Sequence, residues 1–180
     1  MDIRIVKIAE DKDFEKLKHL YDDNNDWRLD YNKPDLSVWT KSVSGISFRM
    51  VKIRTRFPDV LPETLYDVLH DPEYRKVWDT HMIESKDIGF FNPNNDIGYI
   101  VRPSRNGDGS ELGYVSHTDP HGKLPVWLVN KVTQIFAPRM VKKLHKASVA
   151  YPNWKLLNNP NYKPWHFPEQ IASPRIRIED

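Results

Sequence analysis

A long amphipathic segment near the end of the chain constrains the fold more than any other feature. Over residues 124–151, apolar side chains recur at steps of three and four residues, which is typical of a helix with one apolar face. Pro138 lies inside this segment and is expected to kink the helix or split it in two, because proline interrupts the main-chain hydrogen bonds. A helix of this length needs another layer against which to bury its apolar face. The apolar positions are Leu124, Leu128, Val132, Phe136, Met140, Leu144, Ala147 and Tyr151.

Shorter helices and strands are expected in the rest of the chain. A helix is predicted over 11–21, with Asp11 or Asp13 capping its start. A second helix over 62–77 has Pro62 in its first turn and is expected to break at 70–73 and resume over 74–79. The first helix has an apolar face of Phe14, Leu17, Leu20 and Tyr21. Strands are predicted over 27–31, 37–43, 47–56, 82–91, 97–101 and 111–117, and 3–8 fits a strand or a frayed arm.

The order of these elements predicts the fold class. The strand over 47–56 alternates, with Val51 and Ile53 on one side and mostly basic residues on the other. Strands separated by short turns, followed by one long helix, predict an α+β fold in which a curved antiparallel sheet grips that helix. The pattern divides the chain into an N-terminal arm at 1–10, one domain at 11–157 and an irregular tail at 158–180.

Composition limits the function classes. The 180 residues are enough for one domain with a substantial core. There is no cysteine, which excludes disulfides, thiolate metal sites, iron–sulfur clusters and a cysteine nucleophile. No apolar run approaches the roughly 18 residues of a membrane span, and the first residues lack the features of a secretory signal. A cytoplasmic protein is therefore expected.

The charge is distributed unevenly. Between Pro120 and Pro168 there is no carboxylate, whereas eight basic residues occur there. Past Pro138, the basic side chains gather on one arc of the expected helix, and Met140 and Leu144 fall on the other. This arc is either a solvated helix face or a surface that docks on anionic lipid, at about 1 kcal/mol per charge. Nucleic acid is a weaker alternative, because no nucleic-acid-binding motif accompanies the charge. The basic arc consists of Arg139, Lys142, Lys143 and Lys146.

Several blocks of uncommon residues resemble a known family. They are Tyr-Arg-Lys-Val-Trp-Asp at 74–79, Asp-Pro-His-Gly-Lys-Leu-Pro-Val-Trp at 119–127 and Phe-Ala-Pro-Arg-Met-Val-Lys-Lys-Leu at 136–144. With Val-Trp at 38–39, Tyr-Pro-Asn-Trp at 151–154 and Lys-Pro-Trp at 163–165, they occur in family order over about 14–170. The chain resembles the START family of lipid-transfer domains, and within it the phosphatidylcholine-transfer branch.

The resemblance implies a fold, a ligand and a site. The fold is a helix-grip sheet around a C-terminal helix, with a tunnel for one phosphatidylcholine or phosphatidylethanolamine molecule. Arg75 would bind the lipid phosphate, and Asp79 would bind the ammonium group; the alternative for this pair is a solvated i,i+4 ion pair. Tunnel-lining candidates are Tyr74, Trp78 and Tyr114, although core packing is the alternative for Tyr74 and Trp78. Lid and membrane-contact candidates are Phe136, Arg139, Met140, Lys142, Lys143 and Lys146.

The chain departs from the family pattern in the middle of the domain. The stretch Gly98-Tyr99-Ile100-Val101-Arg102-Pro103 fuses two Gly-Tyr blocks that several strands separate in the family. A barrel takes about eight strands to enclose even one small ligand, and six strands are predicted here, or seven with the N-terminal arm. The shortened sheet either re-pairs across the junction or leaves an open apolar groove.

Three functions follow from these observations. The first is binding and transfer of phospholipid between membranes without chemistry, by a cytoplasmic protein that associates peripherally with membranes. The second is a membrane-docking or partner-binding module that holds no lipid, because its tunnel is incomplete. The third is an enzyme of the same superfamily that uses Asp79 or His81, for which no positive sign exists. The scattered histidines lack metal-ligand spacing and no cofactor motif occurs, so neither a metal nor a cofactor is expected.

Overall fold

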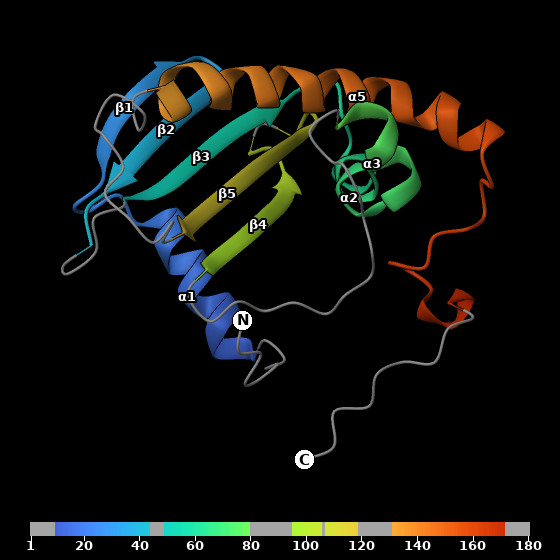
Figure 1. The fold of residues 1–180 in the computed structure, drawn as a ribbon, viewed down its shortest axis with the longest axis horizontal. Coiled ribbons are helices and arrows are strands. Elements are labelled where there is room, and N and C mark those ends of the chain that lie inside the picture. Colours follow the sequence, from blue (N-terminus) through green and yellow to red (C-terminus); the bar gives the residue numbers. More distant parts are fainter. Residues whose placement is uncertain (1–9, 44–48, 80–94, 106, 119–130, 172–180) are drawn as a thin grey trace.

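The computed structural model describes residues 10–43, 49–79, 95–105, 107–118 and 131–171. The predicted strands at 3–8 and 82–91 and the start of the long helix lie outside these residues, and so does nearly all of the N-terminal arm. The α+β prediction is confirmed. A five-stranded antiparallel sheet in the order β1-β2-β3-β5-β4 has α1 on one face and the long helix α5 on the other (Figure 1).

The strands differ from their predicted bounds by a few residues. They are β1 (Arg28–Lys33), β2 (Leu36–Lys41), β3 (Met50–Phe57), β4 (Asn95–Pro103) and β5 (Ser110–Thr118). β4 extends beyond the predicted 97–101 because it pairs with β5 along its whole length, from Asn95 opposite Thr118 to Pro103 opposite Ser110. Hydrogen bonding to a neighbouring strand therefore extends the regular structure past the residues whose alternation indicated it.

The predicted alternation of β3 separates the two faces of the sheet. Val51 and Ile53 pack with the apolar residues under α5. Lys52 points to the opposite face and is fully buried there beneath α1. Its ammonium donates to the main-chain oxygens of Leu20 at 3.1 Å and Asp23 at 2.6 Å. The alternation in the sequence indicated which residues share a face of the sheet. It did not indicate that a helix would cover the face that carries Lys52.

Helix α1 (Asp11–Asp22) is anchored at its C-terminal end. Tyr21 is fully buried and lies over Gly113 of β5, where a Cβ atom would come within 2.3 Å of the tyrosine ring. Phe14, at the N-terminal end of the predicted apolar face, is exposed. The helix begins after Glu10, and Asp13 accepts a hydrogen bond from the Glu10 main-chain N–H at 2.9 Å. Asp13 thus contributes to the cap from the first helical turn.

The expected break in the second helix is confirmed and lies at Asp71. Helix α2 (Pro62–His70) ends there, and helix α3 (Pro72–Trp78) begins. The Asp71 carboxylate accepts hydrogen bonds from the main-chain N–H groups of Glu73 and Tyr74, each at 3.1 Å. Because Asp71 caps the helix and Pro72 occupies its first position, α3 starts two residues earlier than predicted.

The long helix α5 (Ala137–Leu157) lies along the sheet and continues past it over α2 and α3 (Figure 1). A π-helical turn, η1 (Val132–Phe136), precedes it, so Pro138 falls in the first turn of α5 rather than inside it. The helix changes from π- to α-helical winding just before Pro138 but is not split there, because Phe136 between the two segments has helical backbone angles. The helix runs through Pro152 and ends six residues beyond the predicted end at Tyr151, because Trp154 and Lys155 pack against α3 and its cap. No helix in the described ranges is long and apolar enough to cross a bilayer.

Three apolar clusters hold these layers together. The largest joins α5 to α2, α3 and the sheet, and contains Phe57, Leu65, Val68, Tyr74, Leu112, Leu144, Ala147 and Tyr151 among others. A second cluster places Ala137 of α5 on β2 and β3. The third lies on the other face, where Tyr21 packs on Met50 and Val115. The described part of the tail, residues 158–171, consists mainly of turns and a short 3-10 turn, η2 (Pro168–Gln170).

Candidate functional site

The two residues predicted to bind a headgroup lie together at the end of α3. The Nε of Arg75 is 3.4 Å from Oδ2 of Asp79. The Arg75 side chain is 42% exposed, whereas that of Asp79 is only 10% exposed. Among the described residues, the two terminal nitrogens of the guanidinium have no acceptor. This geometry leaves planar N–H donors available to an anionic group, beside a carboxylate that is mostly withdrawn from water.

The position of Asp79 is electrostatically unfavourable by itself. Its main-chain N–H bonds to the Arg75 carbonyl at 2.8 Å, which places the carboxylate at the C-terminal end of α3. Helix C-termini carry partial negative charge and favour cations. A largely buried carboxylate at this point is stabilised by Arg75 and by a further interaction partner, and a cationic ligand would add to this stabilisation.

Two tyrosines complete the site from the sheet. Tyr99 of β4 and Tyr114 of β5 are opposite each other in register, with ring centroids 5.2 Å apart. They share the α5-facing side of the sheet with Val101 and Leu112, which belong to the large apolar cluster. Tyr114 was a predicted lining residue, whereas Tyr99 was not singled out. The alternation of β4, which puts Tyr99 on the same face as Val101, was the available signal.

Tyr99 lies within electrostatic reach of the ion pair. Burial raises the pKa of the Tyr99 hydroxyl, the charges of Tyr114 and Asp79 raise it further, and the charge of Arg75 lowers it. Tyr99 nevertheless keeps 47% of its surface exposed. The charges of Arg75 and Asp79 thus act on Tyr99, whose ring contacts that of Tyr114. We call these four residues the headgroup site, after the role predicted for Arg75 and Asp79.

The other predicted aromatic residues pack in the core. Tyr74 is 3% exposed, and its hydroxyl donates to the main-chain oxygen of Ala147 at 2.8 Å. Its ring contacts those of Tyr151 and Trp154, at centroid distances of 4.9 and 4.7 Å. Trp78 packs against the same cluster, and its buried indole N–H has no partner within the described residues. Tyr74 thus fastens α3 to α5.

The predicted lid residues lie on the first half of α5 and just before it. Arg139, Lys142 and Lys146 are exposed, while Lys143 is partly buried and has an interaction partner. Phe136 and Met140 are also exposed. The structure therefore places large apolar side chains beside three exposed cations.

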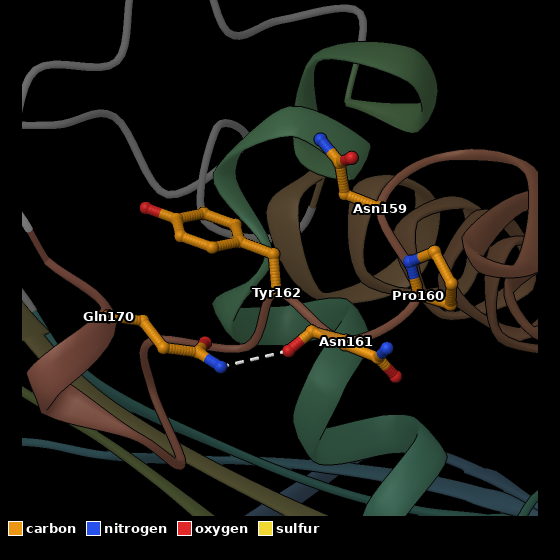
Figure 2. A pocket seen from close by; sticks show the side chains of 5 residues that line it. All are labelled: Asn159, Pro160, Asn161, Tyr162 and Gln170. Atoms are coloured by element: carbon orange, nitrogen blue, oxygen red, sulfur yellow. Dashed lines mark hydrogen bonds between the residues drawn. The ribbon is translucent and has the colours of Figure 1, made fainter.

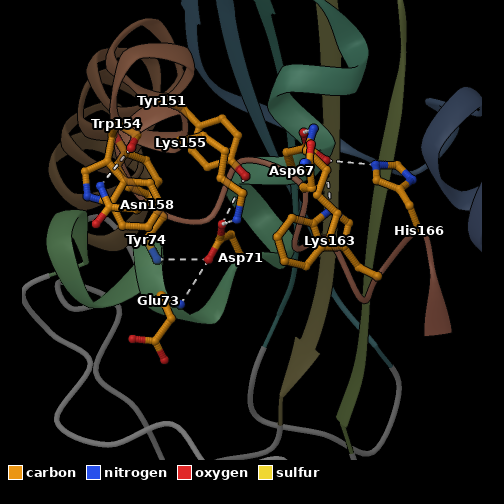
Figure 3. Close-up of polar contacts among 12 residues, drawn as sticks. Asp67, Asp71, Glu73, Tyr74, Tyr151, Trp154, Lys155, Asn158, Lys163 and His166 are labelled. Atoms are coloured by element: carbon orange, nitrogen blue, oxygen red, sulfur yellow. Dashed lines mark hydrogen bonds and ion pairs between the residues drawn. The ribbon is translucent and has the colours of Figure 1, made fainter. Parts of the chain in front are cut away.

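Two buried carboxylates fix the second half of α5 and the tail (Figure 3). Asp71 accepts hydrogen bonds from the Tyr151 hydroxyl at 3.0 Å and the Lys155 ammonium at 2.9 Å. Asp67 of α2 accepts from the Lys163 ammonium at 2.6 Å, and also from Trp165 and His166. The charges of both aspartates are thus satisfied internally. Neither carboxylate was singled out in the sequence, since these side-chain partners lie 80 or more residues away.

Two hollows flank the C-terminal end of α5, each with a volume of about 570 Å³. One lies within the tail and is lined by Asn159, Pro160, Asn161, Tyr162 and Gln170 (Figure 2). The other lies between α3, the end of α5 and the tail, and its lining includes Trp154, Leu157 and Trp165. Neither is lined by any residue of the sheet.

Comparison with known proteins identifies the class of this domain. The START domain family model matches residues 7–102 and 97–155, which together cover most of the chain. START domain-containing protein 10 of mouse and that of human are each 31% identical over 230 residues, spanning 97% of this chain and 79% of the relative. The chain belongs to the START domain family.

Solved structures agree with this assignment. The crystal structure of human STARD10 has a TM-score of 0.76 and 31% identity, covering 96% of this chain and 93% of that chain. Human StAR-related lipid transfer protein 5 shares the fold with a TM-score of 0.53 at 14% identity, covering 78% of this chain and 94% of that chain. The predicted START-type helix-grip fold is therefore confirmed.

The comparisons also locate the shortened region. The two segments matched by the family model overlap at 97–102, within the stretch where two Gly-Tyr blocks are expected to be fused. The alignments with START domain-containing protein 10 span 230 residues, whereas this chain has 180, so part of the relative has no counterpart here. The junction falls in β4, the last strand of the described sheet.

Proposed function

We propose that this domain binds one phospholipid, phosphatidylcholine or phosphatidylethanolamine, between the sheet and α5, and transfers it between membranes without covalent chemistry. Membership of the START family supports a lipid ligand. The observation that carries the proposal for this chain is the headgroup site, in which α3, β4 and β5 bring a cation, an anion and two tyrosines to one place.

The chemistry of this site matches a zwitterionic headgroup. The Arg75 guanidinium forks onto phosphate oxygens, and the Asp79 carboxylate attracts the ammonium group. Tyr99 and Tyr114 add ring faces, which attract a quaternary ammonium by cation–π interaction. The acyl chains would extend under α5, because water exposure costs about 0.8 kcal/mol per methylene.

The first half of α5 supplies the membrane contact in this proposal. Its exposed lysines and arginine attract an anionic surface at about 1 kcal/mol per charge. Phe136 and Met140 lie next to these cations and would enter the bilayer boundary as the helix moves off the sheet. The protein would then associate peripherally with membranes.

One observation favours a second candidate, a membrane-docking or partner-binding module without cargo. The described hollows lie at the far end of α5 and not over the sheet. Leu144 and Ala147 of α5 pack directly on the cluster that contains Phe57 and Leu112. A domain closed in this way would keep the membrane-binding helix and hold no lipid.

Native mass spectrometry of the purified chain, before and after incubation with phosphatidylcholine or phosphatidylethanolamine vesicles, separates the two candidates. The carrier holds close to one phospholipid per chain, and Arg75→Gln and Asp79→Asn reduce this loading. Lys76→Gln is the matched control, because Lys76 lies on the same helix and its ion pair with Glu73 is exposed. Wild-type protein that stays empty refutes the carrier. Loss of vesicle binding in a Lys142→Glu, Lys146→Glu variant of such an empty protein establishes the module.

A further inference from the structure

The two edges of the described sheet are protected to different degrees. At one edge, β1 carries Arg28, Asp30 and Lys33, and its pairing with β2 changes register between Leu29 and Tyr31. Charged side chains and bulges on an edge strand discourage pairing with another chain. At the other edge, β4 pairs with β5 in a regular register along its whole length. Among the described strands, β4 is therefore the edge better suited to accept a further strand.

The sequence of β4 favours such pairing. No charged residue occurs between Asp96 and Arg102, and the residues at 97–101 are Ile-Gly-Tyr-Ile-Val. β-Branched and aromatic residues with little charge favour strand pairing between chains. Helix α1 lies on one face of β4, with Leu17 against Gly98, and so it covers that face and not the hydrogen-bonding edge.

The turn between β4 and β5 shows which main-chain groups of β4 point to the edge. The Ser104 N–H donates to the Gly109 carbonyl at 3.1 Å, in the same register as the two strands. Along an antiparallel pair, residues that bond to the residue opposite alternate with residues that do not. The N–H and C=O groups of Ile97, Tyr99 and Val101 therefore point away from β5, towards the edge.

A second copy of β4 fits this edge over its whole length. Tyr99 is the middle residue of the strand, so an antiparallel pair centred on it uses every residue of both copies. Tyr99 then lies opposite Tyr99 of the second copy, and Ile97 lies opposite its Val101. These are the residues whose main-chain groups point to the edge, so donors meet acceptors across the pair.

The ends of this pairing are also complementary. Asp96 comes opposite Arg102 of the second copy at each end, and opposite charges stabilise a cross-strand pair. Arg102 also forms an ion pair with Glu111 of its own chain, and its side chain is 30% exposed. Pro103 falls at the outermost position, opposite Asn95, where its missing N–H interrupts none of the central pairs.

Helix α1 extends past the strands that it covers. Tyr21 lies over Gly113 of β5 and Leu17 over Gly98 of β4, so the helix crosses the sheet towards its edge (Figure 1). Phe14 lies about one turn nearer the N-terminus on the same side of the helix, and it is 60% exposed. A strand added to β4 would lie in the direction of Phe14 and would give this side chain an apolar surface.

We propose that two copies of this chain associate through their β4 edges, in antiparallel register centred on Tyr99, so that the two sheets become continuous. The shortening of the domain accounts for the available edge, because the part of the relatives without a counterpart falls at β4. Opposite residues of an antiparallel pair share a face of the sheet, so Tyr99 of the second copy joins the headgroup site of the first. That consequence rests on the proposed function, whereas the association itself does not.

Sedimentation equilibrium of the purified chain, without lipid, tests the association. The wild type should form dimers as its concentration rises. Tyr99→Pro should weaken the association about thirtyfold, equivalent to ~2 kcal/mol, because each copy loses a hydrogen bond at the centre of the pairing and none to β5. Tyr99→Phe is the matched control and should associate like the wild type, since it keeps the main-chain donor.

A wild-type chain that stays monomeric at every concentration reached overturns the inference, and so does a folded Tyr99→Pro that dimerises like the wild type. Asp96→Lys keeps the test decisive if Tyr99→Pro fails to fold. It places like charges opposite each other and should weaken the association, and an unchanged association in this variant contradicts the register.

Hydrogen exchange and cross-linking locate the interface. The amides of Ile97, Tyr99 and Val101 should be protected in the dimer and exchange faster on dilution. Protection that does not depend on concentration overturns the inference, because the edge would then be paired within one chain, for which the strand predicted over 82–91 is the candidate. The chain has no cysteine, so Tyr99→Cys should form a disulfide-linked dimer, since opposite Cα atoms are about 5.5 Å apart.

Asn95→Cys is the control for cross-linking. In the proposed register, residue 95 lies about 27 Å from its copy and should stay unlinked. A dimer that links through residue 95 and not through residue 99 overturns the register. Lipid loading by native mass spectrometry is read separately, so an empty chain that still dimerises through β4 refutes the carrier proposal and not this one.

Discussion

Replacing Lys155 by methionine tests how α5 is held in place. The Lys155 ammonium is 2.9 Å from the Asp71 carboxylate, and the two side chains are only 8% and 3% exposed. Methionine keeps the apolar stem of the side chain but removes the charge. The Asp71 carboxylate then stays buried with three remaining donors, namely the Tyr151 hydroxyl and two main-chain N–H groups of α3.

Burial determines the expected size of the effect. Removing one partner of a buried ion pair costs about 3–5 kcal/mol, and the three donors left on Asp71 place this variant at about 3 kcal/mol. A domain of this kind has a total stability of about 5–15 kcal/mol, so the variant folds but is clearly weakened. The comparison is Lys76→Met. The Lys76–Glu73 pair is shorter, at 2.7 Å, but its side chains are 52% and 66% exposed, and such surface pairs contribute about 0–1 kcal/mol.

Urea unfolding followed by tryptophan fluorescence and circular dichroism measures both variants. The free energy of unfolding should fall by about 3 kcal/mol for Lys155→Met and by about 0.5 kcal/mol or less for Lys76→Met. Equal losses in the two variants would show that distance and not burial sets the energy of these pairs, and would refute the reasoning. A loss of less than about 1 kcal/mol for Lys155→Met would show that Asp71 does not depend on the ammonium.

Three further substitutions test other parts of the fold. Burial raises the pKa of Asp67, but its hydrogen bonds, led by the one from Lys163, outweigh burial and hold the pKa below its usual value. The ionised Asp67 carboxylate therefore stabilises the fold above about pH 4, and this contribution is lost as the pH falls further. In Asp67→Asn, the urea midpoint should therefore fall less steeply as the pH is lowered. Burial lowers the pKa of Lys52 to about 8, so between pH 8 and about 10 the unfolded chain binds more protons than the folded chain. The urea midpoint should therefore rise with pH across this window. Lys52→Met should remove this rise. Gly113→Ala places a methyl group 2.3 Å from the Tyr21 ring and should cost about 1–3 kcal/mol in urea unfolding; an unchanged midpoint would contradict the close approach of α1.

Helices and breaks that depend only on neighbouring residues could be predicted from local sequence patterns. The three- and four-residue steps over 124–151 indicated α5, and the His70-Asp71-Pro72 sequence indicated the break between α2 and α3. The extension of α5 through Pro152 was not predictable in this way. It depends on Lys155 meeting Asp71, a contact between residues 84 apart that offsets the lost hydrogen bond.

The residues that local sequence patterns do not reveal are those whose role depends on an element far away in the chain that covers them. The sequence around Lys52 alternates in the same way as around a basic residue on an exposed strand face. Lys52 is buried only because α1 covers it. Tyr99 lies on β4, in the stretch where two Gly-Tyr blocks are expected to be fused, and only the pairing of β4 with β5 puts it opposite Tyr114. Arg75 and Asp79 were found through a motif, since an i,i+4 pair alone indicates a surface ion pair. Their combination with Tyr99 and Tyr114 required the structure.

Shortening of the domain has different effects on the packing of α5 against the sheet and on the enclosure of a ligand. The clusters that hold α5 draw on β2, β3, β5, α2 and α3, all of which this chain retains. The stretch of the relatives without a counterpart falls at β4, the outermost strand of the described sheet on that side. Tyr99 of the headgroup site is on that strand, so the site lies at the shortened edge and not beneath the retained grip. In the proposed function, membrane docking by α5 and enclosure of a lipid would thus rest on different residues, and we expect substitutions at Lys142 and at Arg75 to separate the two properties.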